Sequence, residues 1–204
     1  MVSVAPLFSY PVMMSSEDYR FTQAEKDFID GLEMAENVGN SMSVDDHILE
    51  RPELQKVRQF IELQIDIYKR KVLRIKAENE IYITQSWANR SKANQHHARH
   101  SHPNSIISGV LFCSENKDKR LPPIRFHRTN ELLPLAFSYE EVTDLNCGMY
   151  PFSPIYGRLM LFPSLLQHDV ATNESDEERV TLSFNTFVRG IVGEKTHLTE
   201  VSVN

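Results

Sequence analysis

RVTLSFNTFV, residues 179–188, is the last of five strand-like runs that follow one another from residue 80 onward. The other four are EIYITQSW at 80–87, IISGVLFC at 106–113, PIRFHR at 123–128 and GRLMLF at 157–162. Loops rich in proline, glycine, asparagine and charged residues join these runs, and no helical pattern lies between them. Short strands joined in this way predict antiparallel β structure, either a sandwich, a barrel or a jelly roll. The longest loops, 114–122 and 139–155, are candidates for a lid.

Two helices are predicted before these strands. Thr22 and Glu25 form a capping box, which predicts a helix over residues 23–37 that ends at Gly39. A second helix is expected to begin at Pro52, because apolar residues then recur at steps of three and four. These residues are Leu54, Val57, Ile61, Ile65, Tyr68 and Val72. We expect their stripe to brace the sheet.

The pattern therefore predicts an α+β protein with a single domain. Residues 1–76 form a mainly helical support in this prediction, and residues 77–204 form the β core. Residues 1–14 alternate loosely and contain two prolines, so we expect them to form an edge strand.

Composition narrows the class of protein. The chain has 204 residues, 41% of them apolar and 25% charged, which excludes a disordered chain, a collagen-like repeat and a disulfide-stapled miniprotein. A net charge of −6 without a basic block argues against nucleic acid as a partner. No apolar run approaches the roughly 20 residues of a membrane span, and the N-terminus lacks a signal-peptide pattern. Only two cysteines are present, Cys113 and Cys147, which suggests a reducing compartment and hence a cytoplasmic protein; a disulfide between the two is the alternative.

Four of the eight histidines lie close together, at His96, His97, His100 and His102. If this segment is extended, His100 and His102 project from the same face, because residues two apart on a strand share a face. Paired imidazoles suit iron, zinc or copper, since the neutral ring nitrogen is a good ligand. A polar loop that is merely rich in histidine is the alternative.

A third histidine and an arginine follow in an order that favours a metal site. His168 ends the run LMLFPSLLQH, and Arg179 opens the strand-like run at 179–188. We expect a hairpin to return Arg179 beside His168, about ten ångströms deeper on the same face. This layout suits a small dicarboxylate that chelates a metal at one end and pairs with arginine at the other. Asp169 is a poor alternative ligand, because a strand points it away from the side of His168.

Several short motifs occur together in a fixed order over nearly the whole chain. They are Ser86-Trp87-x-Asn89, His100-Ser101-His102-Pro103-Asn104-Ser105, Ser108-Gly109-Val110, Gly157, Phe162-Pro163-Ser164, His168-x-Val170, Arg179 and Ser183-Phe184-Asn185, with Leu7-Phe8 and the helix from Pro52 to Tyr68. In these motifs the sequence resembles the 2-oxoglutarate- and iron(II)-dependent dioxygenases. Within that superfamily it is similar to a branch found in marine bacteria and their phages.

The resemblance implies a double-stranded β-helix, or jelly-roll, core with helices packed outside. It implies that His100 and His168 bind Fe(II) and that Arg179 binds the far carboxylate of 2-oxoglutarate. Thr181 would add a hydroxyl contact, and Asn104 and Ser108 would line the same pocket. No catalytic residue beyond the metal site is implied.

The implied reaction uses molecular oxygen and releases succinate and CO2. Hydroxylation of a small-molecule or peptide substrate is the default outcome, and the peptide is suggested only by the general shape of prolyl hydroxylases. We also expect a homodimer. If the protein is encoded by a phage, its expected location is the cytoplasm of the host cell.

One position departs from the pattern of the superfamily. Its usual ligand set is two histidines and one carboxylate, whereas His102 stands at the carboxylate position here. His102 is either a third ligand, or a side chain that points away and leaves the position to water or a halide, or part of a site that binds metal without turnover. We favour the third-ligand interpretation.

Two other classes of protein remain open. A three-histidine dioxygenase of the cupin class would use no 2-oxoglutarate, and its arginine would hold the carboxylate of the substrate. A jelly-roll protein with a structural zinc site would explain the histidines but not the spacing to Arg179. Trp87, on a strand next to loops, is more typical of a core plug than of a platform for substrate.

Overall fold

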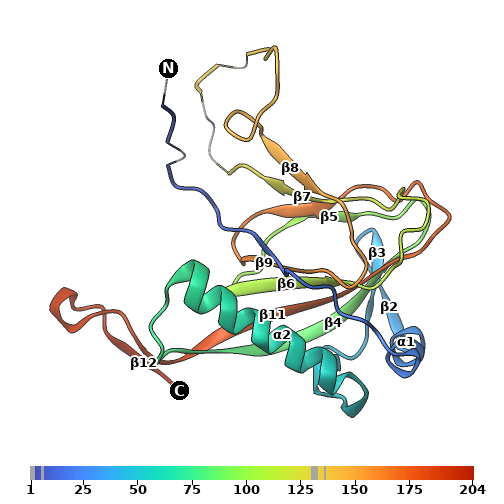
Figure 1. The fold of residues 1–204 in the computed structure, drawn as a ribbon, viewed down its shortest axis with the longest axis horizontal. Helices are drawn as coiled ribbons and strands as arrows, with labels where there is room; N and C mark the ends of the chain where they lie inside the picture. The colour runs from blue at the N-terminus through green and yellow to red at the C-terminus, as the bar shows by residue number, and fades with distance from the viewer. Residues whose placement is uncertain (1–2, 6, 130–132, 136) are drawn as a thin grey trace.

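The structure is a computed structural model that describes residues 3–5, 7–129, 133–135 and 137–204. Its strands form two sheets, and every strand pairing in them is antiparallel. The major sheet has the order β1-β9-β6-β11-β4-β3-β2, with β12 paired to β11, and the minor sheet has the order β5-β10-β7-β8. Figure 1 shows the minor sheet above the major sheet, with helix α2 on the opposite side of the major sheet.

The strands of the major sheet are β1 (Met13–Met14), β2 (Met34–Asn37), β3 (Asn40–Ser43), β4 (Glu80–Ser91), β6 (Ile107–Phe112), β9 (Leu159–Pro163), β11 (Arg179–Val192) and β12 (Val201–Val203). Those of the minor sheet are β5 (His97–His100), β7 (Ile124–His127), β8 (Met149–Phe152) and β10 (His168–Val170). The α-helices are α1 (Gln23–Asp30) and α2 (Gln55–Ile67), and shorter helical turns cover Ile48–Glu50, Pro52–Leu54, Tyr68–Leu73 and Lys195–His197. Of the helices in the described part of the chain, none is long and apolar enough to cross a bilayer.

The second predicted helix is confirmed as α2, and its stripe packs on the major sheet. Five of the six stripe residues, Leu54, Val57, Ile61, Ile65 and Tyr68, are at most 3% exposed. The sixth, Val72, is 40% exposed. Val72 leaves the stripe because the helix widens into a π-helical turn over Tyr68–Leu73, which rotates the following side chains out of register.

The first predicted helix is shorter than expected. The capping box of Thr22 and Glu25 is present, but α1 ends at Asp30. The residues up to Ser43 then form the hairpin of β2 and β3, whose turn contains Gly39 at a φ of 84°. A glycine with a positive φ is typical of a hairpin turn as well as of a helix end. Because Gly39 was read as a helix end, the predicted helix extends too far toward the C-terminus.

The β core also extends further toward the N-terminus than predicted. Strand β3 pairs with β4, and β1 pairs with β9 at the edge of the major sheet. The first 76 residues therefore supply both the supporting helices and three strands. The predicted edge strand over residues 1–14 is reduced to Met13–Met14, and Met1, Val2 and Pro6 lie outside the described residues.

Strand β11 separates the core from the candidate site. Val180, Leu182 and Phe184 belong to the apolar cluster that contains the buried face of α2. Because side chains alternate along a strand, Arg179, Thr181 and Ser183 point to the other face, toward the minor sheet. A second apolar cluster fills part of the space between the sheets, and it includes Phe112, Phe126, Phe162 and Leu166.

Candidate metal centre

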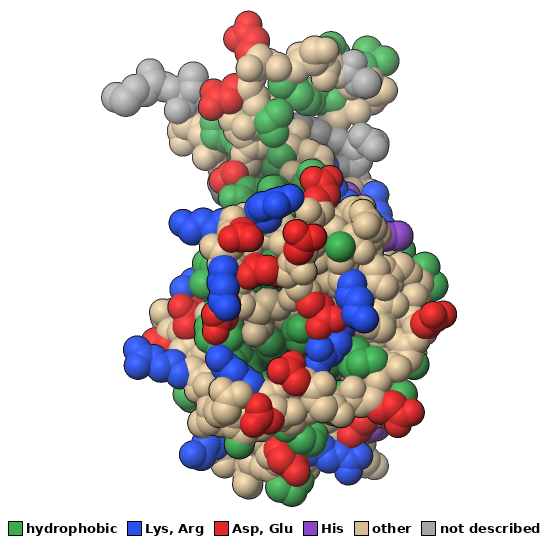
Figure 2. All heavy atoms as spheres, turned by 90° about the vertical axis from the view of Figure 1, so that its right-hand side faces the viewer, with side chains coloured by type: hydrophobic (Ala, Val, Ile, Leu, Met, Phe, Trp, Pro, Cys, Tyr) green, Lys and Arg blue, Asp and Glu red, His purple; other side chains and the backbone are tan. Residues whose placement is uncertain are grey.

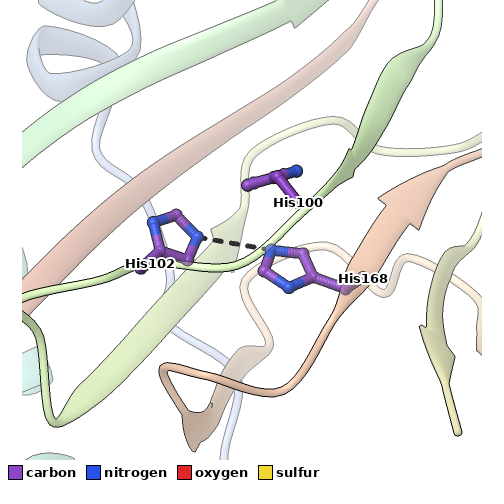
Figure 3. Close-up of side chains that lie close together, drawn as sticks. All are labelled: His100, His102 and His168. Atoms are coloured by element: carbon purple, nitrogen blue, oxygen red, sulfur yellow. Dashed lines mark hydrogen bonds between the residues drawn. The ribbon is translucent and has the colours of Figure 1, made fainter. Parts of the chain in front are cut away.

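Three histidines converge from the minor sheet, as Figure 3 shows. His100 is the last residue of β5, His168 is the first residue of β10, and the two pair directly across the strands. His102 follows β5, where its backbone N–H donates to the carbonyl of Ser164 at 2.8 Å. One ring nitrogen from each of the three lies within 4.8 Å of the others.

The hydrogen bonds of His100 and His168 leave the Nε2 lone pair of each ring free. Nδ1 of His168 lies 2.9 Å from the carbonyl of Leu166, and Nδ1 of His100 lies 2.7 Å from the carbonyl of Ala98. A carbonyl only accepts, so each Nδ1 carries the proton and each Nε2 keeps a free lone pair. Nε2 of His102 lies 3.3 Å from Nε2 of His168. When two nitrogens bind one metal ion, each at about 2.1 Å, and the angle between the two bonds is close to 90°, the nitrogens lie about 3 Å apart. The observed distance between the two Nε2 atoms therefore fits a shared divalent metal ion.

Burial keeps the imidazoles of His102 and His168 uncharged. Desolvation, together with the neighbouring histidines, lowers the pKa of His168 to about 3 and the pKa of His102 to about 4. His168 contacts the apolar cluster between the sheets, with its ring centroid 4.8 Å from that of Phe162 and 5.7 Å from that of Phe126. At neutral pH both rings are therefore free to act as metal ligands.

Arg179 lies on the facing sheet and lacks an anionic partner. Arg179 is only 4% exposed. Its Nε donates a hydrogen bond to the carbonyl of Pro122 at 3.3 Å, and its guanidinium lies 5.6 Å from the ring centre of Phe112. Among the described residues, no carboxylate lies within 4.0 Å of its nitrogens. Burial lowers the pKa of Arg179 to about 10. A buried cation without an anion is costly, so the position fits an anionic ligand.

The predicted route by which Arg179 reaches the histidines is wrong. β10 pairs with β5 and β7, whereas β11 pairs with β4 and β6, so residues 171–178 cross from one sheet to the other instead of closing a hairpin. Arg179 consequently approaches from the opposite sheet and does not lie beside His168. The number of residues between His168 and Arg179 is compatible both with a hairpin and with a crossover between the two sheets.

Comparison with known proteins identifies the chain. The model of a family described as "Putative 2OG-Fe(II) oxygenase" matches residues 85–185, which include the three histidines and Arg179. The chain belongs to this family. It is a 2-oxoglutarate- and Fe(II)-dependent oxygenase, and the predicted superfamily, cofactors and jelly-roll fold are confirmed.

Solved structures share the fold of this oxygenase at low sequence identity. A prolyl-4-hydroxylase from Pseudomonas putida is 14% identical, with 90% of this chain and 96% of that chain covered and a TM-score of 0.60. A 2OG-Fe(II) oxygenase family oxidoreductase from Burkholderia pseudomallei is 16% identical, with coverage of 86% and 83% and a TM-score of 0.57. HygX from Streptomyces hygroscopicus, solved with nickel, 2-oxoglutarate and hygromycin B, is 9% identical, with coverage of 86% and 82% and a TM-score of 0.57. No curated protein matches the sequence.

The remaining predicted residues of the oxygenase fall into two groups. Thr181 is buried on the inner face of β11, on the same side as Arg179. Asn104 lies in an exposed turn at a φ of 59°. The hydroxyl of Ser108 is fully buried, 2.8 Å from the hydroxyl of Ser164 and 2.8 Å from Oδ1 of Asn185. The structure therefore brings Thr181 to Arg179 but gives Asn104 and Ser108 other surroundings.

Asp169 points to the outer face of the minor sheet, as expected for the residue after His168. Its carboxylate pairs with Arg125 through two hydrogen bonds of 2.6 and 2.9 Å and lies 3.0 Å from Nε2 of His127. It is thus separated from the three histidines by the sheet itself.

Two residues beside the histidines were not predicted as part of the site. Trp87 belongs to neither apolar cluster, so the expectation of a core plug is wrong, and its ring lies 5.9 Å from that of His102. His97 stacks on His100 at 4.3 Å between ring centres, because an irregularity in the β5–β10 register turns both rings inward. Desolvation lowers the pKa of His97 to about 3. The dense histidine run was the signal that could have pointed to His97.

These buried histidines predict how the stability of the metal-free oxygenase depends on pH. His97, His102 and His168 have folded pKa values of about 3, 4 and 3, below the ordinary 6.5, so the unfolded chain binds more protons between those values. The free energy of unfolding should fall as the pH drops below about 6.5, by at most about 1.4 kcal/mol per pH unit for each imidazole. Urea unfolding between pH 7.5 and 5 measures this slope. His102→Gln should make it shallower, whereas His197→Gln, at an exposed position, should not; equal slopes would contradict the prediction.

Proposed function

We propose that His100, His102 and His168 bind the Fe(II) of this oxygenase and that Arg179 binds the far carboxylate of 2-oxoglutarate. One observation carries the proposal: three imidazoles converge within 4.8 Å of one another beside one sheet, and a buried guanidinium without a carboxylate partner among the described residues lies on the facing sheet. Thr181 adds a hydroxyl next to Arg179. Asn104 and Ser108 are not part of the site that we propose.

Each part of the chain then has a defined task. The histidines fix the metal, their Nδ1 protons being held by the carbonyls of Ala98 and Leu166. The aromatic rings of Phe126 and Phe162 exclude water from the side of His168. When bound, Fe(II) with 2-oxoglutarate and oxygen supplies the oxidising chemistry, which converts 2-oxoglutarate to succinate and CO2. The outcome for the substrate that we propose is hydroxylation.

The structure supports a direct role for His102. Its Nε2 lies 3.3 Å from that of His168, which favours a third ligand over a side chain that leaves the position to water or a halide. A neutral imidazole in place of a carboxylate leaves the metal site with one negative charge fewer.

The finer assignments are proposals as well. We propose a small molecule or a peptide as the substrate, the cytoplasm as the location, and the marine bacterial and phage branch as the group of relatives. Figure 2 shows positive and negative side chains interspersed over one face, which supports a substrate other than nucleic acid. A membrane partner is not part of the proposal, and a homodimer stays a prediction.

Titration with 2-oxoglutarate tests the proposed function. Anaerobic Fe(II)-loaded protein should develop a weak visible charge-transfer band on addition of 2-oxoglutarate. Arg179→Gln should weaken this binding at least about 10-fold, because the buried cation is lost, while leaving iron content unchanged. Arg99→Gln, at an exposed position on β5, is the control. Iron-loaded protein that never develops the band would contradict this proposal.

Removal of a proposed ligand should abolish tight iron binding. His100→Ala and His168→Ala leave two imidazoles, so we expect the dissociation constant for Fe(II) to rise by at least about 10-fold. Iron content after anaerobic gel filtration measures this, and quenching of the single tryptophan, Trp87, by Co(II) gives a second readout. His96→Ala, in the same run of histidines, is the control. Wild-type iron content in either ligand variant would refute the assignment.

His102 can be tested by restoring the carboxylate. His102→Asp should retain more iron than His102→Ala, because aspartate reaches the metal from the same face and adds a negative charge. Decarboxylation of 2-oxoglutarate without substrate should change in rate in His102→Asp but still be measurable. If both variants bind iron as well as the wild type, His102 is not a ligand and the position is open.

A further inference from the structure

Three polar residues lie in one row across the inner face of the major sheet. Ser91 of β4 pairs directly with Arg179 of β11, and Met42 of β3 pairs with Asn89 of β4. Directly opposed residues in an antiparallel pair share a face, so the same register places Asn40 next to Ser91. Neighbouring strands are about 4.8 Å apart, so along this row Ser91 lies about 5 Å and Asn40 about 10 Å from Arg179. A carboxylate held between the ends of these side chains can contact all three residues.

The polar atoms of this row lack partners. Asn40 is 3% exposed and Ser91 is 1% exposed. Among the described residues, no hydrogen-bond partner is present for Oδ1 or Nδ2 of Asn40 or for Oγ of Ser91. Each buried polar group left in this state costs about 1–3 kcal/mol, and such groups are rare in native proteins. They lie in the same row as Arg179, whose guanidinium has no carboxylate partner among the described residues.

Asn173, a buried asparagine in the same region, differs from Asn40 in that its side chain is fully hydrogen-bonded. Asn173 is fully buried, and its Nδ2 donates to the carbonyls of Ser91 and Glu177 at 2.9 and 2.8 Å. Its Oδ1 accepts from the backbone N–H of Ser175 at 3.1 Å. Every polar atom of that side chain is used by the backbone around it. The contrast indicates that Asn40 and Ser91 serve a ligand and not the fold.

The chemistry of the unused groups matches a carboxylate. The amide Nδ2 of Asn40 and the hydroxyl of Ser91 can both donate, as can the guanidinium nitrogens of Arg179 that are not bonded to Pro122. Oδ1 of Asn40 can accept an N–H of the same guanidinium and so hold it in place. Oδ1 of Asn89, two residues before Ser91, is also without a partner, while its Nδ2 donates to the hydroxyl of Ser183 at 3.0 Å.

We propose that Asn40 and Ser91 bind the far carboxylate of 2-oxoglutarate together with Arg179. The inference rests on the proposed role of Arg179 and adds strand β3, from the first quarter of the chain, to the cosubstrate site. The three residues form a composite site in which one charge and two neutral donors surround the same two oxygens.

Anaerobic titration of the Fe(II)-loaded protein tests this site. Asn40→Ala should raise the dissociation constant for 2-oxoglutarate about 10-fold, and Ser91→Ala about 3- to 10-fold, since each removes one hydrogen bond to a charged group. Iron affinity should not change, because neither residue is a proposed ligand. Ser41→Ala, the next residue of β3 on the opposite face, is the matched control.

A second ligand separates binding from a structural role. 2-Oxopentanoate has the same chain length and chelating end but a methyl group in place of the far carboxylate. Asn40→Ala should leave its affinity unchanged, because the lost contact is specific to that carboxylate. Asn40→Asp should fold and should bind 2-oxoglutarate more weakly than Asn40→Ala, since the new carboxylate occupies Arg179.

Each outcome decides a different point. If Asn40→Ala and Ser91→Ala bind 2-oxoglutarate like the wild type, only water occupies these groups and the inference is wrong. If both ligands weaken equally in Asn40→Ala, the residue is structural and the inference is again wrong. If Arg179→Gln itself keeps wild-type affinity for 2-oxoglutarate, the proposed function of Arg179 has failed, which is a separate result.

Discussion

The direct pairing of His100 with His168 across β5 and β10 is the contact on which the candidate site depends. Cross-strand partners hold their side chains on one face, and here the ring centres are 4.3 Å apart. A slip of one residue would turn His168 outward and bring Asp169 inside. The hydrogen bonds from Arg125 to Asp169 on the outer face oppose that slip. A polar contact on the outer face of the minor sheet therefore helps to keep His168 on the inner face.

The same logic of two faces connects the hydrophobic core to Arg179. Val180, Leu182 and Phe184 are buried against the side of the major sheet that α2 covers. Their burial stabilises β11 by about 1.5–3 kcal/mol for each large apolar side chain. That stabilisation holds the neighbouring Arg179 in a position that is unfavourable for a charge without a partner. Helix α2 therefore supports the site from the opposite face of the major sheet.

Elements with a clear sequence pattern could be predicted, whereas several short strands without one could not. The apolar stripe from Leu54 to Tyr68 spans several turns, so its period is unmistakable, and the five strand-like runs all correspond to strands. Strands β5 and β10 have four and three residues, too few to show any period. The β2–β3 hairpin was missed because the capping box at Thr22 favours a helix, and Gly39, which was read as the end of that helix, lies in the hairpin turn instead.

The candidate site shows the same division between local pattern and long-range register. The spacing of His100, His102 and His168 points to a metal centre because ligand type and order carry information by themselves. Asn40 and Ser91 carry no such information, since a lone polar residue in a short segment is typical of a surface loop. A helix over residues 23–37 that ends at Gly39 would leave Asn40 in an exposed turn. Only the pairing of β3 with β4 turns Asn40 inward beside Ser91, and only the pairing of β4 with β11 brings both to Arg179. A polar group acquires a role at this site through the strand opposite it, which is a property of the folded sheet and not of the residues that precede or follow it in the chain.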